Sequence, residues 1–516
     1  MKTFTRVLAL ILATLTLLAV VVACDQAGSG DEGGSVENSA YDINGRLNDN
    51  LPDDLNYKGE KVNVMYWSDV ENLEFEVESV TGNNVSDAIF DRNNRIEDRL
   101  NVELVWNGVP GNANNRTGFV RQVQAYADAG QGSADIIATY SRTAGTLAVQ
   151  GLLIDLATIK DSYVDLDMPW WPSQMVDTVS FGNAQGTSYY FLTGDISTNT
   201  MQMIHLLYFN KGMVESYGLE NPYQLVYEGK WTMDKMVAMT SDCYKDLDRD
   251  GTVSYADQYG FVGFDYVAAS FVSSCNLRCI SKGTASQDTL VLSPDFGSAK
   301  MARLLSKLGD WAAQDGVRIH NGSVESIDTR SQLSTAFKSG RALMMIGFVV
   351  NARGFSQSQN LELGLLPTPK YDESQVNYYS GMGNPYSLYG IFVDFDERGN
   401  KKETLSKFTA VLECWASEGY RLTTPQVYES IFGTKYAAGQ SDDTNMFEYV
   451  RAGVIFDLGQ VFAAYLSTIN ERPAKAFCEN VTWLEVYPYL EYTIGKQLEE
   501  LCNSFRTYQA QRDQGR

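Results

Sequence analysis

The chain has 516 residues and a formal net charge of -23, from 41 Lys and Arg against 64 Asp and Glu. This charge argues against a nucleic-acid-binding protein, because there is no basic stripe to neutralise phosphates, and it also disfavours a polyanionic ligand. Only two histidines occur, which excludes a histidine-rich catalytic metal site.

The first residues have the layout of a secretory signal. Lys2 and Arg6 precede an apolar run over residues 7–23, which stops at Cys24. The string VVAC at the end of this run resembles the bacterial lipobox, in which the cysteine receives diacylglycerol and becomes the mature N-terminus. We therefore expect a signal peptide over 1–23, lipidation of Cys24, and an extracytoplasmic protein anchored to the cell membrane. An uncleaved membrane anchor is the alternative, although the run is slightly short for a spanning helix of about 20 residues.

Residues 24–58 are expected to form a flexible tether. They are rich in Gly, Ser, Asp, Glu and Asn and contain few large apolar residues, so they cannot bury enough surface to offset the entropy of ordering. The remainder is too long for one simple domain, which predicts two lobes.

Alternation of apolar residues predicts strands, and apolar residues at helical spacing predict amphipathic helices. Strands are expected at 62–66, 102–106, 134–140, 206–210, 342–348 and 361–366. Helices are expected around Ile89, Ile96 and Leu100, over 119–126, from Lys211, over 231–240 and 298–313, and through most of the chain after Glu403. The alternation of strand and helix in the first part is typical of a parallel sheet with crossover helices.

Several short motifs occur in a characteristic order along the chain. They are VNVMYW (62–67), FDRNNRIEDRLNVEL (90–104), DIIATY (135–140), GLLIDL (151–156), LYFNK (207–211), GKWTMDKM (229–236), SGRALMMIG (339–347) and LGLLPTP (363–369). This order resembles the family 1 extracellular solute-binding proteins, whose best-known member is the maltose-binding protein. The resemblance covers nearly the whole chain beyond the tether.

The resemblance implies an α/β fold of the two-lobed type II periplasmic-binding-protein class, with a central sheet flanked by helices in each lobe and a ligand cleft between the lobes. By analogy, the N-lobe would contain 59–194 plus 334–393, and the C-lobe 195–333 plus 394–516. The implied function is that of a monomer that captures a neutral mono- or oligosaccharide. It would deliver this sugar, chemically unaltered, to the transmembrane subunits of an ABC permease.

Residues 246–257 (DLDRDGTVSYAD) match the pattern of a calcium-binding loop, with Gly251 at the tight turn. Oxygen donors stand at loop positions 1, 3, 5, 7, 9 and 12, namely Asp246, Asp248, Asp250, Thr252 through its carbonyl, Ser254 and Asp257. Asp257 replaces the usual Glu, which resembles dockerin-type loops. We expect a structural Ca²⁺ in the C-lobe; an acidic surface turn is the alternative.

Sugar recognition needs flat aromatic faces and fixed polar groups around the hydroxyls. Such residues concentrate in the loops that follow strands. The predicted ligand-binding residues are Tyr66, Trp67, Asp69, Tyr140, Arg142, Trp170, Trp171, Asp195, Phe348, Asn351, Tyr379, Met382 and Asn384. For any single aromatic among them, packing in the core is the alternative role.

Other functional classes leave weaker signals. The sequence has no HExxH, GxSxG or P-loop motif, and its six cysteines after Cys24 lack the spacing of a zinc site. A secreted glycoside hydrolase needs only two carboxylates across a cleft, so counting acidic residues does not exclude it. A surface glycan-binding or sensor protein without a transport role is a further alternative, because it would have the same tether and cleft.

Overall fold

The computed structural model describes residues 40–42, 44–129, 133–172, 181–183, 186–283, 290–321, 325, 327–393, 401–432, 441–479 and 481–513. The expected signal peptide and Cys24 lie outside these residues. The chain from Asp49 onward forms one compact unit. None of the helices in the described ranges combines the length and apolar composition that a membrane crossing requires.

The first sheet has the strand order β13-β3-β1-β2. Its strands are β1 (Glu60–Trp67), β2 (Val102–Val109), β3 (Ile136–Tyr140) and β13 (Ser387–Ile391). The first three are parallel, as their alternation with helices predicted, whereas β13 runs antiparallel to β3. Val62 and Val64 of β1 are fully buried, so the apolar positions that predicted this strand face the core.

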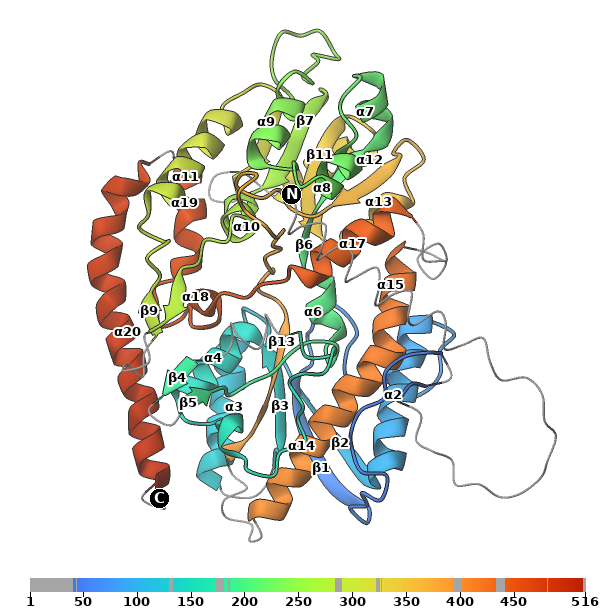
Figure 1. Ribbon diagram of the computed structural model, residues 1–516, viewed down its shortest axis with the longest axis vertical. Coiled ribbons are helices and arrows are strands. Elements are labelled where there is room, and N and C mark those ends of the chain that lie inside the picture. The colour runs from blue at the N-terminus through green and yellow to red at the C-terminus, as the bar shows by residue number, and fades with distance from the viewer. Residues whose placement is uncertain are drawn as a thin grey trace, which may run out of the picture. The chain divides into compact units, whose positions relative to one another are not determined.

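Helices cover the first sheet and follow the expected amphipathic pattern. The helices are α2 (Asn84–Leu100), α3 (Arg116–Ala129), α4 (Ser141–Val149) and α14 (Lys401–Glu418). In α2, Ile89, Ile96 and Leu100 are buried, and Asn83 caps the first turn by accepting two backbone N–H groups. Figure 1 shows α14 beside α2 against β1 and β2, where Trp415 meets Trp106 edge to face.

The second sheet has the strand order β10-β7-β11-β6-β12. Its strands are β6 (His205–Asn210), β7 (Tyr259–Phe264), β10 (Val317–His320), β11 (Ala342–Phe348) and β12 (Leu363–Leu366). β10, β7 and β11 are parallel, whereas β6 runs antiparallel to both β11 and β12. Two small hairpins, β4–β5 (Phe181–Asn183 and Gly186–Ser188) and β8–β9 (Ile280–Lys282 and Leu290–Leu292), complete the strands of the described ranges.

The second sheet has its own helices, some from the segments between its strands and others from the chain after β13. They are α7 (Lys211–Ser216), α8 (Pro222–Tyr227), α9 (Met233–Ser241), α10 (Val267–Ser274), α11 (Ala299–Ala312), α12 (Ile327–Lys338), α13 (Asn351–Ser356), α17 (Asp442–Ala452) and α19 (Arg472–Glu479). α9 and α12 contact β7, and α8 and α17 contact β12. The helices expected from residue 211, over 231–240 and over 298–313 are thereby confirmed as α7, α9 and α11.

Several chain segments run between the two sheets. One passes from a bridge of Leu192 to Tyr389 through α6 (Thr198–Gln202) to β6, and another runs from β12 to β13. α14 continues through a π-helical turn (Gly419–Thr423) into α15 (Thr424–Phe432), and α18 (Leu458–Val461) contacts α4. The last helix, α20 (Trp483–Asp513), contacts both α11 and α4.

The expected lobe boundaries are wrong in two places. β11 and β12, expected with the N-lobe as part of 334–393, pair with β7 and β6 in the second sheet, with Met344 opposite Phe209. α14, expected with the C-lobe as part of 394–516, packs on the first sheet, where Trp415 contacts Trp106 of β2 and Tyr389 of β13. Strand pairing decides the first assignment and side-chain packing the second, and neither is visible in the local sequence.

The expected tether over 24–58 also extends too far. The side chain of Asp49 is fully buried and accepts two hydrogen bonds from Arg99, at 2.6 and 2.7 Å, and one from Ser417 at 2.5 Å. Leu51 is buried as well. Residues 49–58 therefore belong to the folded body, because a buried carboxylate with these partners is held in place.

Candidate functional site

The carboxyl ends of the parallel strands face the connecting segments in both sheets. β3 ends at Tyr140, which lies opposite Ser387, the first residue of β13. β11 ends at Phe348, which lies opposite His205, the first residue of β6. Because both β13 and β6 begin where a connecting segment enters a sheet, the two carboxyl edges are the positions where open α/β sheets bind ligands.

At the first edge, the turn after β3 presents polar groups. The Ser141 hydroxyl donates to the carbonyl of Asn384 at 2.7 Å, and Arg142 forms an ion pair with Glu471. Arg142 Nε and the Thr143 hydroxyl are buried and have no hydrogen-bond partner among the described residues. Buried polar atoms are nearly always satisfied, so an ordered water is the expected partner of these two atoms.

At the second edge, three aromatic rings form a compact cluster in which each ring contacts the other two. The His205 ring lies parallel to Tyr266, with centroids 5.4 Å apart, and 4.9 Å from Phe348. Burial lowers the pKa of His205 to about 3, so the imidazole is neutral, and its Nδ1 lies 2.7 Å from the Ser270 hydroxyl. The uncharged cluster packs His205 in the interior, whereas the partly exposed Tyr266 and Phe348 rings line the adjacent cavity.

A cavity of about 280 Å³ opens beside this cluster, between α12 and α13. Its lining includes Phe264, Tyr266, Arg330, Lys338, Phe348 and Asn351. Phe348 and Asn351 were predicted as ligand-binding residues, and the structure brings them together here. Phe264, Tyr266 and Arg330 were missed, although an apolar run at 259–264 followed by Asp-Tyr marks a strand end.

The three tryptophans predicted as a ligand platform are core residues instead. Trp67, Trp170 and Trp171 are at most 1% exposed, so no ring face is open to a sugar. The Trp67 indole N–H donates to Ser387 at 2.9 Å, and those of Trp170 and Trp171 donate to Glu413 on α14 at 2.9 and 2.8 Å. The core-packing alternative therefore applies to all three.

Asp195 and Asp69 also have structural partners. Asp195 is 1% exposed and accepts hydrogen bonds from Arg451 at 2.9 Å and Thr424 at 3.0 Å, so it fastens connecting segments together. Burial raises the pKa of Asp195, and the Arg451 charge opposes this shift. Asp69 accepts from the backbone N–H groups of Gly111 and Asn112, which orders the loop after β2.

The remaining predicted residues are dispersed. The Tyr66 hydroxyl donates to Glu76 at 3.0 Å, and its ring packs against Phe75. Tyr140 is 1% exposed, and burial raises its pKa. Met382 and Asn384 lie in the segment that enters β13, where the Met382 carbonyl accepts from Gln460.

Tyr379 lines a different cavity, of about 500 Å³, together with Asn276, Lys300 and Arg303. This second cavity is built around α11 and the loop before β13. Neither of the two carboxyl edges contributes to this second cavity. The predicted residues therefore do not converge on a single pocket.

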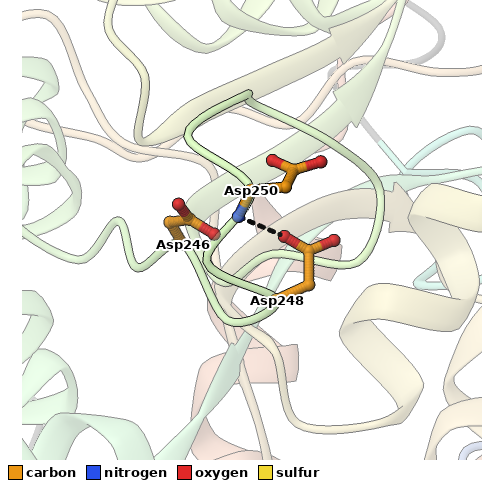
Figure 2. A group of neighbouring side chains, drawn as sticks. All are labelled: Asp246, Asp248 and Asp250. Atoms are coloured by element: carbon orange, nitrogen blue, oxygen red, sulfur yellow. Dashed lines mark hydrogen bonds between the residues drawn. The ribbon is translucent and has the colours of Figure 1, made fainter.

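The predicted calcium loop connects α9 to β7. An antiparallel bridge between Lys245 and Gln258 closes it. Carboxylate oxygens of Asp246, Asp248 and Asp250 lie within 4.8 Å of one another, as Figure 2 shows. Local desolvation raises the pKa of Asp248, and the neighbouring Asp250 carboxylate contributes to this shift. The three oxygens are the hard donors that Ca²⁺ prefers.

The other predicted metal ligands lie differently. Asp257 is fully buried and accepts from the backbone N–H groups of Leu247 at 3.1 Å and Ser254 at 2.7 Å. The Thr252 hydroxyl donates to Asp250 at 2.6 Å. The loop therefore gathers three of the six predicted positions around one point, and Asp257 instead ties the two ends of the loop together.

No family model matches this chain, and no curated protein matches it in sequence. Solved structures do match it in fold. The GacH receptor of Streptomyces glaucescens, solved unliganded and with acarbose, has a TM-score of 0.52 at 13% identity over 86% of this chain and 99% of its own. The cyclic alpha-maltosyl-1,6-maltose binding protein of Arthrobacter globiformis has a TM-score of 0.53 at 13% identity over 85% and 99%.

A family 1 extracellular solute-binding protein from Bifidobacterium longum subsp. infantis has a TM-score of 0.50 at 14% identity over 87% of this chain and all of its own. These neighbours are binding proteins, and the last belongs to the family that the motif order resembles. The chain therefore has the two-lobed α/β fold of these solute-binding proteins, as the sequence predicted.

Proposed function

We propose that this chain is the extracytoplasmic carbohydrate-binding subunit of an ABC importer and acts without chemical change of its ligand. The observation that carries the proposal is the pair of carboxyl edges, each next to the segments that connect the sheets. One edge holds the buried Arg142 Nε and Thr143 hydroxyl, which have no hydrogen-bond partner among the residues that the structure describes, and the other holds the cluster of Tyr266, His205 and Phe348.

The two edges suit a sugar because its ring has an apolar C–H face and a rim of hydroxyls. Aromatic side chains pack against the C–H face, and fixed polar groups form hydrogen bonds with the hydroxyls. A ligand that contacts both edges favours a closed arrangement, because such contacts form only when the lobes approach. The fold shared with solved sugar-binding receptors supports this reading.

A thermal-shift screen of the purified chain against a panel of mono- and oligosaccharides tests the proposal. A ligand that binds only the native state raises the melting temperature with its concentration. Small-angle scattering with the best ligand should then show a smaller radius of gyration. Recovery of the saccharide in cleaved form would instead favour a glycoside hydrolase.

We further propose that residues 246–257 hold a structural Ca²⁺ through Asp246, Asp248 and Asp250. The loop immediately precedes β7, and Arg341 next to β11 donates to its Tyr255 and Asp257 carbonyls at 2.7 and 2.9 Å. A bound cation would neutralise three clustered carboxylates and thereby stabilise the approach to the second sheet. The sequence pattern, with Gly251 at a left-handed φ of 78°, supports this assignment.

The N-terminal sequence supports a membrane location for the proposed subunit, and the family resemblance supports a permease partner. We propose that Cys24 carries a lipid that anchors a monomeric protein to the outer face of the cell membrane, next to a permease. Mass spectrometry of the protein purified from membranes tests the lipid. Replacement of Cys24 by Ser should release the protein into the medium.

A further inference from the structure

The cavity between α12 and α13 has the dimensions of a small-ligand subsite. Its volume of about 280 Å³ lies just below the range for ligand pockets, which begins at about 300 Å³. Tyr266 and Phe348 line it with aromatic rings whose centroids are 5.0 Å apart. Such a space suits one sugar ring better than a long chain.

The charge of this cavity is opposite to that of the protein. Arg330 and Lys338 of α12 both line it, and no Asp or Glu does. The Arg330 guanidinium carbon lies 4.5 Å from the Phe264 ring centroid and 5.8 Å from that of Tyr266, so the aromatic rings hold it in place. In the part of the chain that the structure describes, neither cation forms an ion pair with a carboxylate, although the chain has 64 acidic residues.

A guanidinium held over aromatic rings is suited to recognise a planar anion. It presents its N–H donors in a rigid fork that matches the two oxygens of a carboxylate, and it is more weakly hydrated than an ammonium. Lys338 supplies a second positive charge at the same cavity, and its Nζ lies 5.8 Å from the Phe355 ring centroid. Asn351 is held by the backbone N–H of Phe348 at 2.8 Å, which gives the cavity a fixed amide.

We propose that this cavity binds a sugar residue that bears a carboxylate, a hexuronic acid, with Arg330 as its bidentate partner and Lys338 as a second positive charge. The inference rests on the proposed carbohydrate-binding function and names the chemical class of the ligand. It replaces the neutral sugar that the family resemblance implied, because the two cations that line the cavity are the charges nearest to a bound group. A single carboxylate remains compatible with the acidic surface, unlike a polyanion.

Isothermal titration calorimetry of the full chain tests this assignment. The probes are glucuronate and galacturonate with their disaccharides, each matched with the corresponding neutral sugar. We expect an acidic probe to bind at least about tenfold more tightly than its neutral counterpart. This preference should shrink when the ionic strength rises from about 0.05 to about 0.5 M, because salt screens the charges.

Variants of the two cations test whether the preference for acidic sugars arises in this cavity. Arg330→Gln should weaken the acidic probe about 10- to 100-fold and the neutral one less than about threefold, with a smaller loss for Lys338→Gln. Arg330→Lys should recover only part of the affinity, because it keeps the charge but not the fork. Lys230→Gln, an exposed cation remote in sequence, is the control and should change neither affinity.

The outcomes separate the two proposals. Binding of neutral sugars in preference to every acidic probe would overturn the uronate assignment and leave the proposed function standing. Binding of an acidic probe that neither Arg330→Gln nor Lys338→Gln weakens would also overturn it. If no saccharide of either class binds, both proposals fail. If Arg330→Gln does not fold, Lys338→Gln and the salt dependence decide.

Discussion

The carboxylate of Asp195 lies 2.9 Å from the guanidinium Nη2 of Arg451, although 256 residues separate them in the chain. Asp195 belongs to the segment that leaves the first sheet, and Arg451 ends α17 on the second sheet. Thr424, at the start of α15, donates to the same carboxylate. One buried carboxyl group therefore joins the segment that leaves the first sheet, the start of α15 and helix α17.

Arg451→Met should destabilise the protein. The variant leaves Asp195 buried without its cation. Removing one partner of a buried ion pair lowers the free energy of unfolding by about 3 kcal/mol. Urea unfolding at neutral pH measures the change. Lys475→Met, which removes an exposed cation from its pair with Glu479, should leave the unfolding midpoint unchanged. Equal effects of the two variants would contradict the role given to Asp195.

Gly419→Ala should disturb the same junction. A Cβ at Gly419 would lie 2.1 Å from the backbone oxygen of Asp195, so the π-helical turn and the connecting segment would have to separate. We expect a loss of about 1–3 kcal/mol in the free energy of unfolding. Gly118→Ala in α3 is the matched control, because nothing lies within 4 Å of its added Cβ. Alanine there should be neutral or slightly stabilising.

Glu413 should make stability depend on pH. Burial raises its pKa to about 7 in the folded protein, from 4.5, while hydrogen bonds from Trp171, Asp165 and Trp170 oppose the shift. Because the folded state holds this proton more tightly, its contribution to stability is fully present below pH 4.5 and is lost as the pH rises through 7. The loss is on the order of 3 kcal/mol.

Glu413→Gln removes this titration. Urea unfolding of the wild type and of the variant at a series of pH values between about 4 and 8 measures the difference. The stability of the wild type should fall relative to that of the variant across this range. Parallel profiles for the two proteins would show that Glu413 does not bind a proton preferentially in the folded state.

Calcium should raise the melting temperature of the chelator-treated protein. At a free concentration of about 100 times its dissociation constant, a ligand of the native state adds about 2.7 kcal/mol of stability. Asp248→Ala should abolish both the heat of calcium binding and the thermal shift. Asp310→Ala, at an exposed position of α11, should retain both. Absence of a calcium-dependent heat in the wild type would contradict the site.

Local pattern predicted the secondary structure well, because burial follows periodicity. The strand expected over 342–348 is β11 with the same limits, and the stripe at Ile89, Ile96 and Leu100 is the buried face of α2. The sheet to which a strand belongs depends on hydrogen bonds between distant segments. β11 and β12 were therefore assigned to the wrong lobe, since nothing in their composition distinguishes the two sheets.

The site was harder to predict for a related reason. An aromatic residue after a strand has the same local sequence whether its ring faces a cleft or the core. Trp170 and Trp171 are held in the core by Glu413, which lies more than 240 residues away, so their neighbours in sequence gave no indication. Phe348 and Asn351 could be anticipated because Phe348 ends the buried strand β11 and Asn351 follows three residues later, at the carboxyl end of the sheet.

The strand β13 gives the chain an unusual order of completion during synthesis. All five strands of the second sheet lie between residues 205 and 366, whereas the first sheet lacks its edge strand until residues 387–391 have been made. Domains usually fold from the N-terminus as the ribosome releases them. Here the sheet that begins the chain is the last to close, so a released chain that ended near residue 370 would contain every strand of the second sheet but not the edge strand of the first.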